Sequence, residues 1–413
     1  MRIKDVRLYI VSTTIKYKDV FWEERLLRPI DIYPEHDTEG PGEWNLVRIN
    51  SDLYKVRGTF IEIESDEGLK GIFGPLGAPI GDIEAFIISR RLKPLLIGSN
   101  PFEIEKLWDK MYRLLVHGRK GYAMMAISAV DCALWDLLGK ALNKPVYALL
   151  GGPTRDKVQA YASMLGFSVD PSDVGKRAME YAERGFKYQK WFMRYGPQHG
   201  VKGFEKNVGL VKAIRDAIGY DVDIMIDAWM SWNVDYSFKM ACALDRYEVL
   251  WLEEPLMPDD LAGYIQLSKK IRSAGLSIKL AGGEHEYTRW GFKTLIDNQI
   301  FDVLQPDIAW AGGITEVLKI CSIASANALQ VIPHTAVMAA TLHLAFSLPA
   351  TVVPLAEYLV KWNIINQAVY ETQYHPMSGA FEAPKLPGLG LEFRRDAKKM
   401  ELKFPFYEGI LND

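Results

Sequence analysis

Six polar residues stand at the ends of short apolar runs in the second half of the chain, where buried strands would end. They are Asp227, Glu253, Glu284, Asp307, His334 and Glu357. The sequence VLWLEEPL at residues 249–256 is typical, because an apolar run there meets two carboxylates and a proline. Neighbouring members of the set are roughly 30 residues apart, which is the length of one strand–helix unit. This spacing predicts that the six side chains share one end of a sheet.

Three of the six are carboxylates on consecutive units: Asp227, Glu253 and Glu284. Carboxylates that converge in a buried place repel one another unless a cation neutralises them. Mg²⁺ prefers a few carboxylates together with water and substrate oxygens. We therefore predict a Mg²⁺ site on these three residues; the alternative for any one of them is an acid that caps a helix. Glu254 follows Glu253, so strand alternation predicts that its side chain points away.

Asp307 and His334 end the next two runs. An Asp on a neighbouring strand can hold an imidazole through one ring nitrogen and leave the other nitrogen free as a base. We predict a catalytic pair here; the alternative is a histidine that is simply satisfied in a loop. His285 directly follows Glu284 and is expected at the same site, in contact with substrate.

Short β-rich runs, each followed by a helical stretch, recur from residue 158 onward. The runs cover 158–163, 188–192, 222–228, 249–255, 278–285, 303–308, 329–335 and 354–359. Parallel strands need a crossover helix to return the chain, so eight such units predict a parallel (β/α) barrel. All eight strand ends of a barrel point to one mouth, where active sites of this fold lie.

The first third of the chain follows a different pattern. Residues 1–11 alternate polar and apolar and predict a strand, and residues 58–74 predict a hairpin around the turn SDEG. Helices are predicted over 101–116 and 124–140. The segment 12–55 is rich in Pro, Gly and charge, and a connection of that length is often a functional lid.

Composition narrows the classes of function. The chain has 413 residues and a net charge of −3, so no basic face is implied and neither nucleic acid nor a membrane is expected as a partner. No segment is expected to span a bilayer, and the N-terminal residues lack the apolar core of a signal peptide, which predicts a cytoplasmic setting. Cys132, Cys242 and Cys321 have no metal or disulfide spacing and are expected to be buried free thiols.

Several motifs resemble the mandelate racemase branch of the enolase superfamily. In chain order they are AISAVDCALWDLLGKALNKPVYALLGG, WLEEP, GGEH, LQPDIAWAGGITE and IPHT. The first resembles the segment that leads into the family's barrel, and the others resemble the ends of its strands four to seven. Each motif is weak alone, but five in this order make a strong signal, and the resemblance covers nearly the whole chain.

The resemblance implies an α/β fold, a modified (β/α) barrel under an N-terminal α+β capping domain. The implied regions are a capping domain with substrate-specificity loops over 1–125, a catalytic barrel over 126–375, and a C-terminal segment over 376–413 that returns to the capping domain. The implied site places Mg²⁺ on the three carboxylates, an Asp307–His334 pair as base, and Glu357 near the substrate carboxylate. A homo-oligomer, from dimer to octamer, is also implied.

One departure from the family bears on the reaction. The family often carries Lys-x-Lys on its second strand, but QKWFMRYGP here has Lys190 at the first position and Phe192 at the second. A racemase needs a base on each face of a planar intermediate, whereas a dehydratase can work with one. Lys190 and Arg194 share one strand parity, so both are candidates for binding substrate oxygens. The alternative for Arg194 is a surface salt bridge.

The motif DAWMS at 227–231, the missing second lysine and the nearby YGP resemble the L-rhamnonate dehydratase group. His36, in YPEHD, is a further candidate for substrate contact. The prediction is Mg²⁺-dependent dehydration of a small-molecule sugar acid, such as L-rhamnonate or a related hexonate or pentonate, to the 2-keto-3-deoxy acid through an enediolate. Two alternatives stay open. One is an epimerase, racemase or cycloisomerase with Lys190 or Arg194 as the opposite-face acid, and the other is a non-catalytic sugar-acid binding protein.

Overall fold

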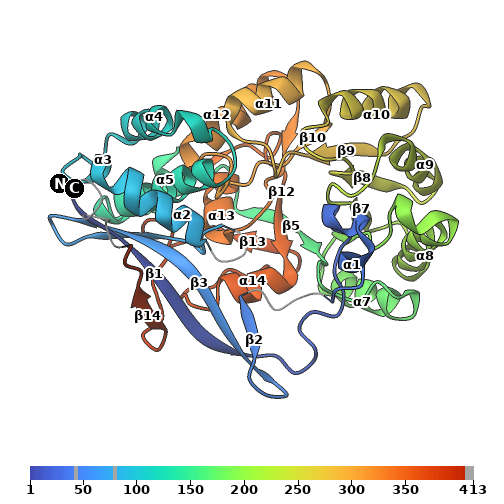
Figure 1. The fold of residues 1–413 in the computed structure, drawn as a ribbon, viewed down its shortest axis with the longest axis horizontal. Helices are drawn as coiled ribbons and strands as arrows, with labels where there is room; N and C mark the ends of the chain where they lie inside the picture. The colour runs from blue at the N-terminus through green and yellow to red at the C-terminus, as the bar shows by residue number, and fades with distance from the viewer. Residues whose placement is uncertain (41–44, 78–80, 405–413) are drawn as a thin grey trace, which may run out of the picture.

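The computed structural model describes residues 1–40, 45–77 and 81–404. Two sheets organise them (Figure 1). A five-stranded antiparallel sheet comes mostly from the first residues of the chain, and a nine-stranded, mainly parallel sheet curls through the remainder. Helices pack around the parallel sheet, which confirms the predicted α/β barrel with an N-terminal cap.

The antiparallel sheet has the strand order β14–β1–β3–β2, and β4 also pairs with β3. Its strands are β1 (Ile3–Lys16), β2 (Leu46–Arg48), β3 (Leu53–Ser65), β4 (Lys70–Phe73) and β14 (Lys398–Glu401). The predicted hairpin is the β3–β4 pair. β1 is longer than the predicted 1–11, because β3 continues to pair with it as far as Lys16. β14 pairs with β1, so late residues contact the N-terminal sheet, while the three region boundaries stay a prediction.

Helices of the N-terminal part pack against the antiparallel sheet, against one another and against helices of the barrel. They are α2 (Asp82–Ile87), the π-helical turn Ile88–Leu92, α3 (Lys93–Leu96), α4 (Ile104–Leu114), α5 (Tyr122–Ala141) and α6 (Val146–Leu149). α5 lies so close to β4 that a Cβ on Gly71 would come within 2.1 Å of the Ala133 carbonyl oxygen. α5 is long and apolar enough to cross a membrane, which corrects the expectation that no segment is. Most of it is buried inside the protein, so its apolar surface serves packing.

All eight runs predicted as barrel strands are strands in the structure. They are β5 (Lys157–Ser163), β6 (Tyr188–Phe192), β7 (Asp223–Asp227), β8 (Val249–Glu253), β9 (Lys279–Gly282), β10 (Val303–Leu304), β11 (Gln330–Val331) and β12 (Leu355–Leu359). Their pairing runs β11–β10–β9–β8–β7–β6–β5–β12, and β13 (Ala380–Glu382) joins β5 in the antiparallel sense. Among the described residues no ladder joins β11 to β12, but Val331 N donates to Val352 O at 2.8 Å.

A helix follows each barrel strand. These helices are α7 (Pro171–Glu183), α8 (Gly200–Ile218), α9 (Val234–Asp245), α10 (Leu261–Ser273), α11 (Thr288–Asp297), α12 (Gly313–Ala326), α13 (Met338–Ser347) and α14 (Val360–Asn366). Cys132 on α5 and Cys321 on α12 are buried free thiols as expected. Cys242 is exposed, which corrects the third expectation, because it lies on the solvent side of α9.

A plug of buried apolar side chains fills the barrel below its mouth. The plug consists of Tyr161, Met225, Trp251, Ala281, Val303, Ile332 and Leu355. Nearly every strand contributes one member, as expected for a barrel whose interior is a packed core. Polar side chains at the carboxyl ends of the strands therefore lie above this plug, in the mouth.

Residues 21–39, here called the strap, cross the mouth. They include the 3-10 turn Pro29–Ile32 and α1 (Pro34–Asp37), and Figure 1 shows this blue segment beside β7, α7 and α8. Leu27 N donates to Met193 O (2.9 Å), and Ser231 Oγ donates to Leu27 O (2.8 Å). These bonds tie the strap to the loops after β6 and β7. The strap lies within the segment predicted as a lid.

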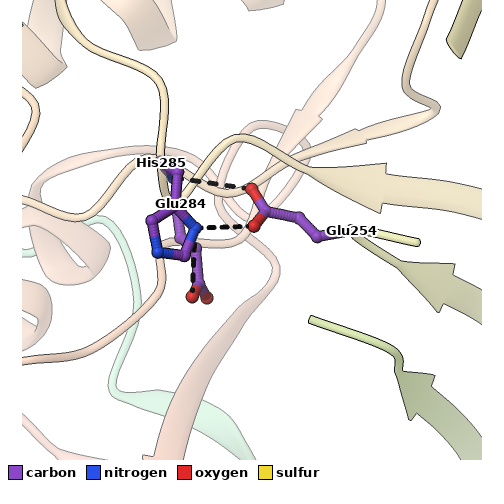
Figure 2. Close-up of side chains that lie close together, drawn as sticks. All are labelled: Glu254, Glu284 and His285. Carbon is purple, nitrogen blue, oxygen red and sulfur yellow. Dashed lines mark hydrogen bonds and ion pairs between the residues drawn. The ribbon is translucent and has the colours of Figure 1, made fainter. Parts of the chain in front are cut away.

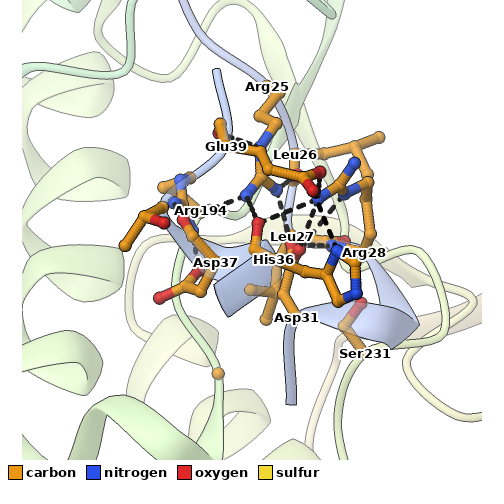
Figure 3. Close-up of polar contacts among 12 residues, drawn as sticks. Arg25, Leu26, Leu27, Arg28, Asp31, His36, Asp37, Glu39, Arg194 and Ser231 are labelled. Atoms are coloured by element: carbon orange, nitrogen blue, oxygen red, sulfur yellow. Dashed lines mark hydrogen bonds and ion pairs between the residues drawn. The ribbon is translucent and has the colours of Figure 1, made fainter. Parts of the chain in front are cut away.

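Buried charge fixes the shape of the strap. Asp31 accepts hydrogen bonds from both Arg25 and Arg28 (Figure 3). Arg25 also donates to the carbonyl oxygens of His36 and Asp37, each at 3.0 Å. Burial alone would raise the pKa of Asp31, but Arg28 and Arg25 hold that pKa below its usual value. The carboxylate stays ionised, so the strap is a folded unit held by its own ion pairs.

Candidate active site

The structure brings Asp307 and His334 together at the ends of β10 and β11. His334 Nδ1 lies 2.7 Å from Asp307 Oδ2. Backbone N–H groups of Ala309 (2.7 Å) and Ala336 (2.8 Å) donate to the two oxygens of Asp307 and fix its orientation. The other ring nitrogen, Nε2, faces Glu284 Oε2 at 3.6 Å. This arrangement leaves Nε2 on the mouth side, as a general base requires.

The charges around His334 set its protonation. Burial lowers the pKa of His334, but the carboxylates of Glu284 and Glu357 and the bond to Asp307 outweigh burial and raise it to about 10. A protonated imidazole is no base. The charge of Glu284 is the largest cause that raises the pKa of His334. A cation that neutralises Glu284 therefore lowers this pKa, and His334 can then act as a base.

Asp227, Glu253 and Glu284 meet at the mouth because they end β7, β8 and β9, or follow them, in register. Asp227 is paired with Glu253, and Glu253 with Ala281, in the parallel ladders. All three side chains are buried. Burial, followed by the charges of Glu253 and Glu284, raises the pKa of Asp227 well above its usual value, although Lys190 opposes the rise. A buried, oxygen-only set of carboxylates that repel one another fits a hard cation such as Mg²⁺.

Lys190 lies among these acids. Its ammonium contacts Glu253, lies 2.9 Å from Glu357 Oε1, and lies 3.5 Å from Asp227 Oδ2. Glu253 is held further by Trp251 Nε1 (3.0 Å). The lysine balances part of the negative charge and leaves a net excess of carboxylates in the mouth.

Glu357 is fully buried and lies in the middle of β12, two residues before the end that was predicted to carry it. Its Oε2 accepts from Thr335 N at 3.0 Å. Burial would raise its pKa, but Lys190 and His334 together hold that pKa below the usual value. The carboxylate is therefore ionised. It links Lys190, which contacts Oε1, to the loop of His334, whose neighbour Thr335 donates to Oε2.

Glu254 does not point away as strand alternation predicts. Its backbone has a φ of +35°, so the chain has already left the strand and alternation no longer applies. Figure 2 shows its carboxylate against His285, with Oε2 at 2.7 Å from Nδ1, while Oε1 accepts from Gly283 N at 2.9 Å. The ligand atoms of Glu254, Glu284 and His285 lie within 4.8 Å of one another.

In this structure the second cluster contains an ion pair between Glu254 and His285. Burial lowers the pKa of His285, but Glu254 and then Glu284 outweigh burial and raise it to about 9. His285 and Glu254 therefore neutralise each other beside Glu284.

A cavity of about 380 Å³ lies between the strap and the barrel mouth. Of the residues expected in the site, Lys190, Asp227, Glu284 and His334 line it. Its other walls are largely apolar and aromatic, with Trp22, Leu26, Leu165, Trp229, Trp310, Leu359 and Trp362. Polar and charged side chains outside the predicted set also line the cavity, namely Glu24, Arg25, Arg28, Asn45, Ser163 and Asn366.

Three residues expected to bind substrate do not line this cavity. Arg194 Nη1 pairs with Asp37 of the strap at 2.8 Å, the ring of His36 bonds Glu39, and His285 bonds Glu254. Arg194 thus makes a salt bridge, the alternative considered for it, and its partner lies in the strap (Figure 3). Their contact with a substrate stays a prediction.

Several cavity residues have no motif that marks them. Trp22 comes from the strap, and Leu165 and Trp362 follow β5 and β12. Trp229 lies inside the motif DAWMS, from which no role for its side chain was predicted. Its backbone N donates to Asp227 Oδ1 and its indole N to Glu284 Oε1, each at 3.0 Å. Leu165 and Trp362 could have been predicted as cavity residues from their positions shortly after barrel strands, because the mouth of the barrel lies at the carboxyl ends of its strands.

Comparison with known proteins agrees with this geometry. Residues 52–151 match the family described as mandelate racemase / muconate lactonizing enzyme, N-terminal domain. Residues 173–397 match the family described as enolase C-terminal domain-like. The chain belongs to the enolase superfamily. Its place in the mandelate racemase branch of that superfamily is the one that its motifs predict.

Relatives within the superfamily cover nearly all of the chain. The L-rhamnonate dehydratase of Saccharopolyspora erythraea is 34% identical over 98% of this chain and 99% of its own length. The solved L-rhamnonate dehydratase from Gibberella zeae has a TM-score of 0.80 at 29% identity, over 95% of this chain and 94% of that one. The 3,6-anhydro-D-galactonate cycloisomerase from Zobellia galactanivorans has a TM-score of 0.76 at 29% identity, over 95% and 97%.

Proposed function

We propose that this protein is a Mg²⁺-dependent dehydratase that removes water from an aldonic acid and forms the 2-keto-3-deoxy acid. The observation that carries the proposal is the Asp307–His334 pair, with one ring nitrogen on the mouth side, opposite a strand on which Phe192 stands where a second lysine base would be. The dehydratase names of the relatives support the same reaction class. A structure of rhamnonate dehydratase from Gibberella zeae in complex with Mg supports the metal.

In this proposal Asp227, Glu253 and Glu284 hold Mg²⁺. When bound, Mg²⁺ supplies positive charge that stabilises the enediolate formed from the substrate carboxylate. His334 Nε2 takes the proton from C2, and Asp307 holds the imidazolium that results. His334 then returns the proton to the hydroxyl on C3, which leaves as water. The enol product takes a proton at C3 and becomes the ketone.

The apolar part of the cavity wall supports a substrate that carries an apolar group at its distal carbons. Trp22, Leu26, Leu165, Leu359 and Trp362 belong to this part of the wall. A hydroxyl buried against such a wall without a partner loses its hydrogen bonds to water. A 6-deoxy acid such as L-rhamnonate presents a methyl group there, whereas L-mannonate, otherwise identical, presents a hydroxyl. We propose L-rhamnonate as the first substrate to test.

The test is a screen of aldonic and aldaric acids with purified protein and Mg²⁺. A carbonyl reagent detects the 2-keto-3-deoxy products, and a chelator serves as control. We expect a signal with L-rhamnonate or another hexonate that the chelator abolishes and that His334→Asn lacks. Product formation that survives the chelator, or that His334→Asn retains, would overturn the roles proposed here.

A second candidate function is cycloisomerisation or epimerisation through the same enediolate. The likeness to the 3,6-anhydro-D-galactonate cycloisomerase favours it, as does the ammonium of Lys190 inside the site. In this case the substrate C2 hydrogen exchanges in D₂O without loss of water, which NMR detects. Lack of any Mg²⁺-dependent thermal shift would instead favour a sugar-acid binding protein. The homo-oligomer and the cytoplasmic location stay predictions.

A further inference from the structure

The side chain of Lys361 is fully buried, and the proposed reaction gives it no task. Lys361 follows β12 directly and precedes Trp362, which lines the cavity. Its ammonium donates to three oxygens: Phe21 O (2.5 Å), Glu23 Oε1 (2.8 Å) and Gly166 O (2.8 Å). The first two belong to the strap and the third to the loop after β5. A buried ammonium is costly unless it is paired and fully bonded, so this triple contact is specific.

The strap is also bonded directly to the loop after β5. Glu23 N and Glu24 N donate to Gly166 O at 2.9 and 3.4 Å, and Ser168 N donates to Glu23 Oε2 at 3.0 Å. Gly166 has a φ of +91°, and a Cβ there would come within 2.5 Å of the Trp22 ring. The backbone conformation and the close approach both require glycine. The junction is tightly packed around the lysine.

This junction forms one wall of the cavity. Trp22 from the strap, Gly166 from the loop after β5, and Trp362 from α14 all line it. The rings of Trp22 and Trp362 lie with their centroids 5.0 Å apart. The ammonium of Lys361 also lies 4.2 Å from the centre of the Phe167 ring, which adds a cation–π contact. One side chain on α14 thus connects the three segments that form this wall of the cavity.

We propose that Lys361 is a positioning residue that pins the strap to the loop after β5 and so builds the aromatic wall of the cavity formed by Trp22 and Trp362. It touches no reacting atom. The expected change in KM rests on the proposed function. The pinning of the strap by Lys361 does not depend on that function.

The test compares Lys361→Met with the native protein. Methionine keeps the length of the side chain and removes all three hydrogen bonds. We expect hydrogen–deuterium exchange of the amides in residues 21–28 to become at least about tenfold faster, since one charge-assisted hydrogen bond is worth about that factor. We expect KM for an accepted sugar acid to rise about tenfold while kcat changes less than about threefold, because the wall binds a part of the substrate that does not react.

Lys140→Met is the matched control. Lys140 is another largely buried lysine that bonds several chain segments, including Leu391 O (2.9 Å) and Asp136 (2.9 Å), and it does not line the cavity. This variant should lose stability without faster exchange in residues 21–28 and without a change in KM. Equal effects in the two variants would overturn the proposal, because both would then report a general loss of stability.

Gly166→Ala tests the same junction from the other side, and it replaces Lys361→Met if that variant does not fold. The added methyl group meets the Trp22 ring, so strap exchange and KM should rise in the same way. Unchanged exchange in a folded variant overturns the pinning of the strap. If the native protein turns over no sugar acid, the proposed function is wrong. Hydrogen–deuterium exchange still tests whether Lys361 pins the strap, because this measurement needs no substrate.

Discussion

Asp307 Oδ2 and His334 Nδ1 lie 2.7 Å apart, and two backbone N–H groups hold the aspartate in place. The imidazole therefore has a fixed tautomer and a fixed orientation when Nε2 acts as base.

Asp307→Asn is expected to lower kcat by about 10²–10⁴-fold, the usual contribution of a general base, because the amide no longer stabilises the imidazolium. The Mg²⁺-induced rise in melting temperature should persist. Asp302→Asn, at the other end of β10, where Asp302 bonds Leu280 N and Arg272, serves as control and should keep kcat. Equal kcat values in the two variants would contradict the role given to Asp307.

Glu284→Gln is expected to abolish the stabilisation by Mg²⁺. The native protein should gain about 2.7 kcal/mol at a Mg²⁺ concentration 100 times the Kd, seen as a rise in melting temperature. Glu286→Gln is the matched control, since Glu286 pairs with Lys120 at 2.7 Å outside the carboxylate set. A full Mg²⁺ shift in Glu284→Gln would remove Glu284 from the ligand set.

Leu165→Asn is expected to change the choice between L-rhamnonate and L-mannonate. An apolar pocket disfavours an added hydroxyl by up to about 10²-fold in kcat/KM, so the native protein should prefer L-rhamnonate. The asparagine offers a partner for the extra hydroxyl and should narrow the ratio about tenfold. Competition assays with both acids measure this ratio directly. An unchanged ratio would mean that Leu165 does not contact the distal carbon.

Stability above pH 8 is expected to depend on Lys361. Burial lowers the pKa of Lys361 to about 8, although Glu23 acts to raise it. The unfolded chain, with a lysine pKa of about 10.4, binds more protons than the folded one between those two values. The contribution of Lys361 to the free energy of unfolding therefore rises with pH over this window and is constant below it.

Urea unfolding at pH 7.5 and 9.5 measures this effect. The native protein should gain stability relative to Lys361→Met as the pH rises. The difference in the free energy of unfolding between the native protein and Lys140→Met should be the same at both pH values. Burial acts to lower the pKa of Lys140, but Asp136 outweighs burial and raises it above its usual value, so this group stays protonated in both states. If the difference in the free energy of unfolding between the native protein and Lys361→Met were also independent of pH, the pKa of Lys361 would not be lowered.

The sequence allowed the strand-end residues to be predicted because a parallel sheet brings all carboxyl ends to one edge. Asp227, Glu253, His334 and Glu357 are in the mouth for that reason. Alternation failed for Glu254, since the strand ends at Glu253, two residues earlier than the pattern indicates, and Glu254 has a positive φ.

The substrate-facing walls depend on contacts that no local pattern encodes. Arg194 bonds Asp37, and Trp22 packs on Trp362, across long separations in sequence. Such pairs form only when the strap has folded over the barrel, so residue type and spacing do not reveal them. Lys361 is the same case, because its partners lie in two distant segments.

The pairing of β14 with β1 bears on the order in which the protein assembles during synthesis. β1 emerges from the ribosome first and finds β3 soon afterwards, but its other edge stays open until residues 398–401 are made. During that interval the nascent chain carries an unpaired strand edge, which is a template for pairing with another chain. We therefore expect the last strand of the sheet to protect the first from aggregation, and we expect truncation before residue 398 to produce an insoluble product even though the whole barrel is present.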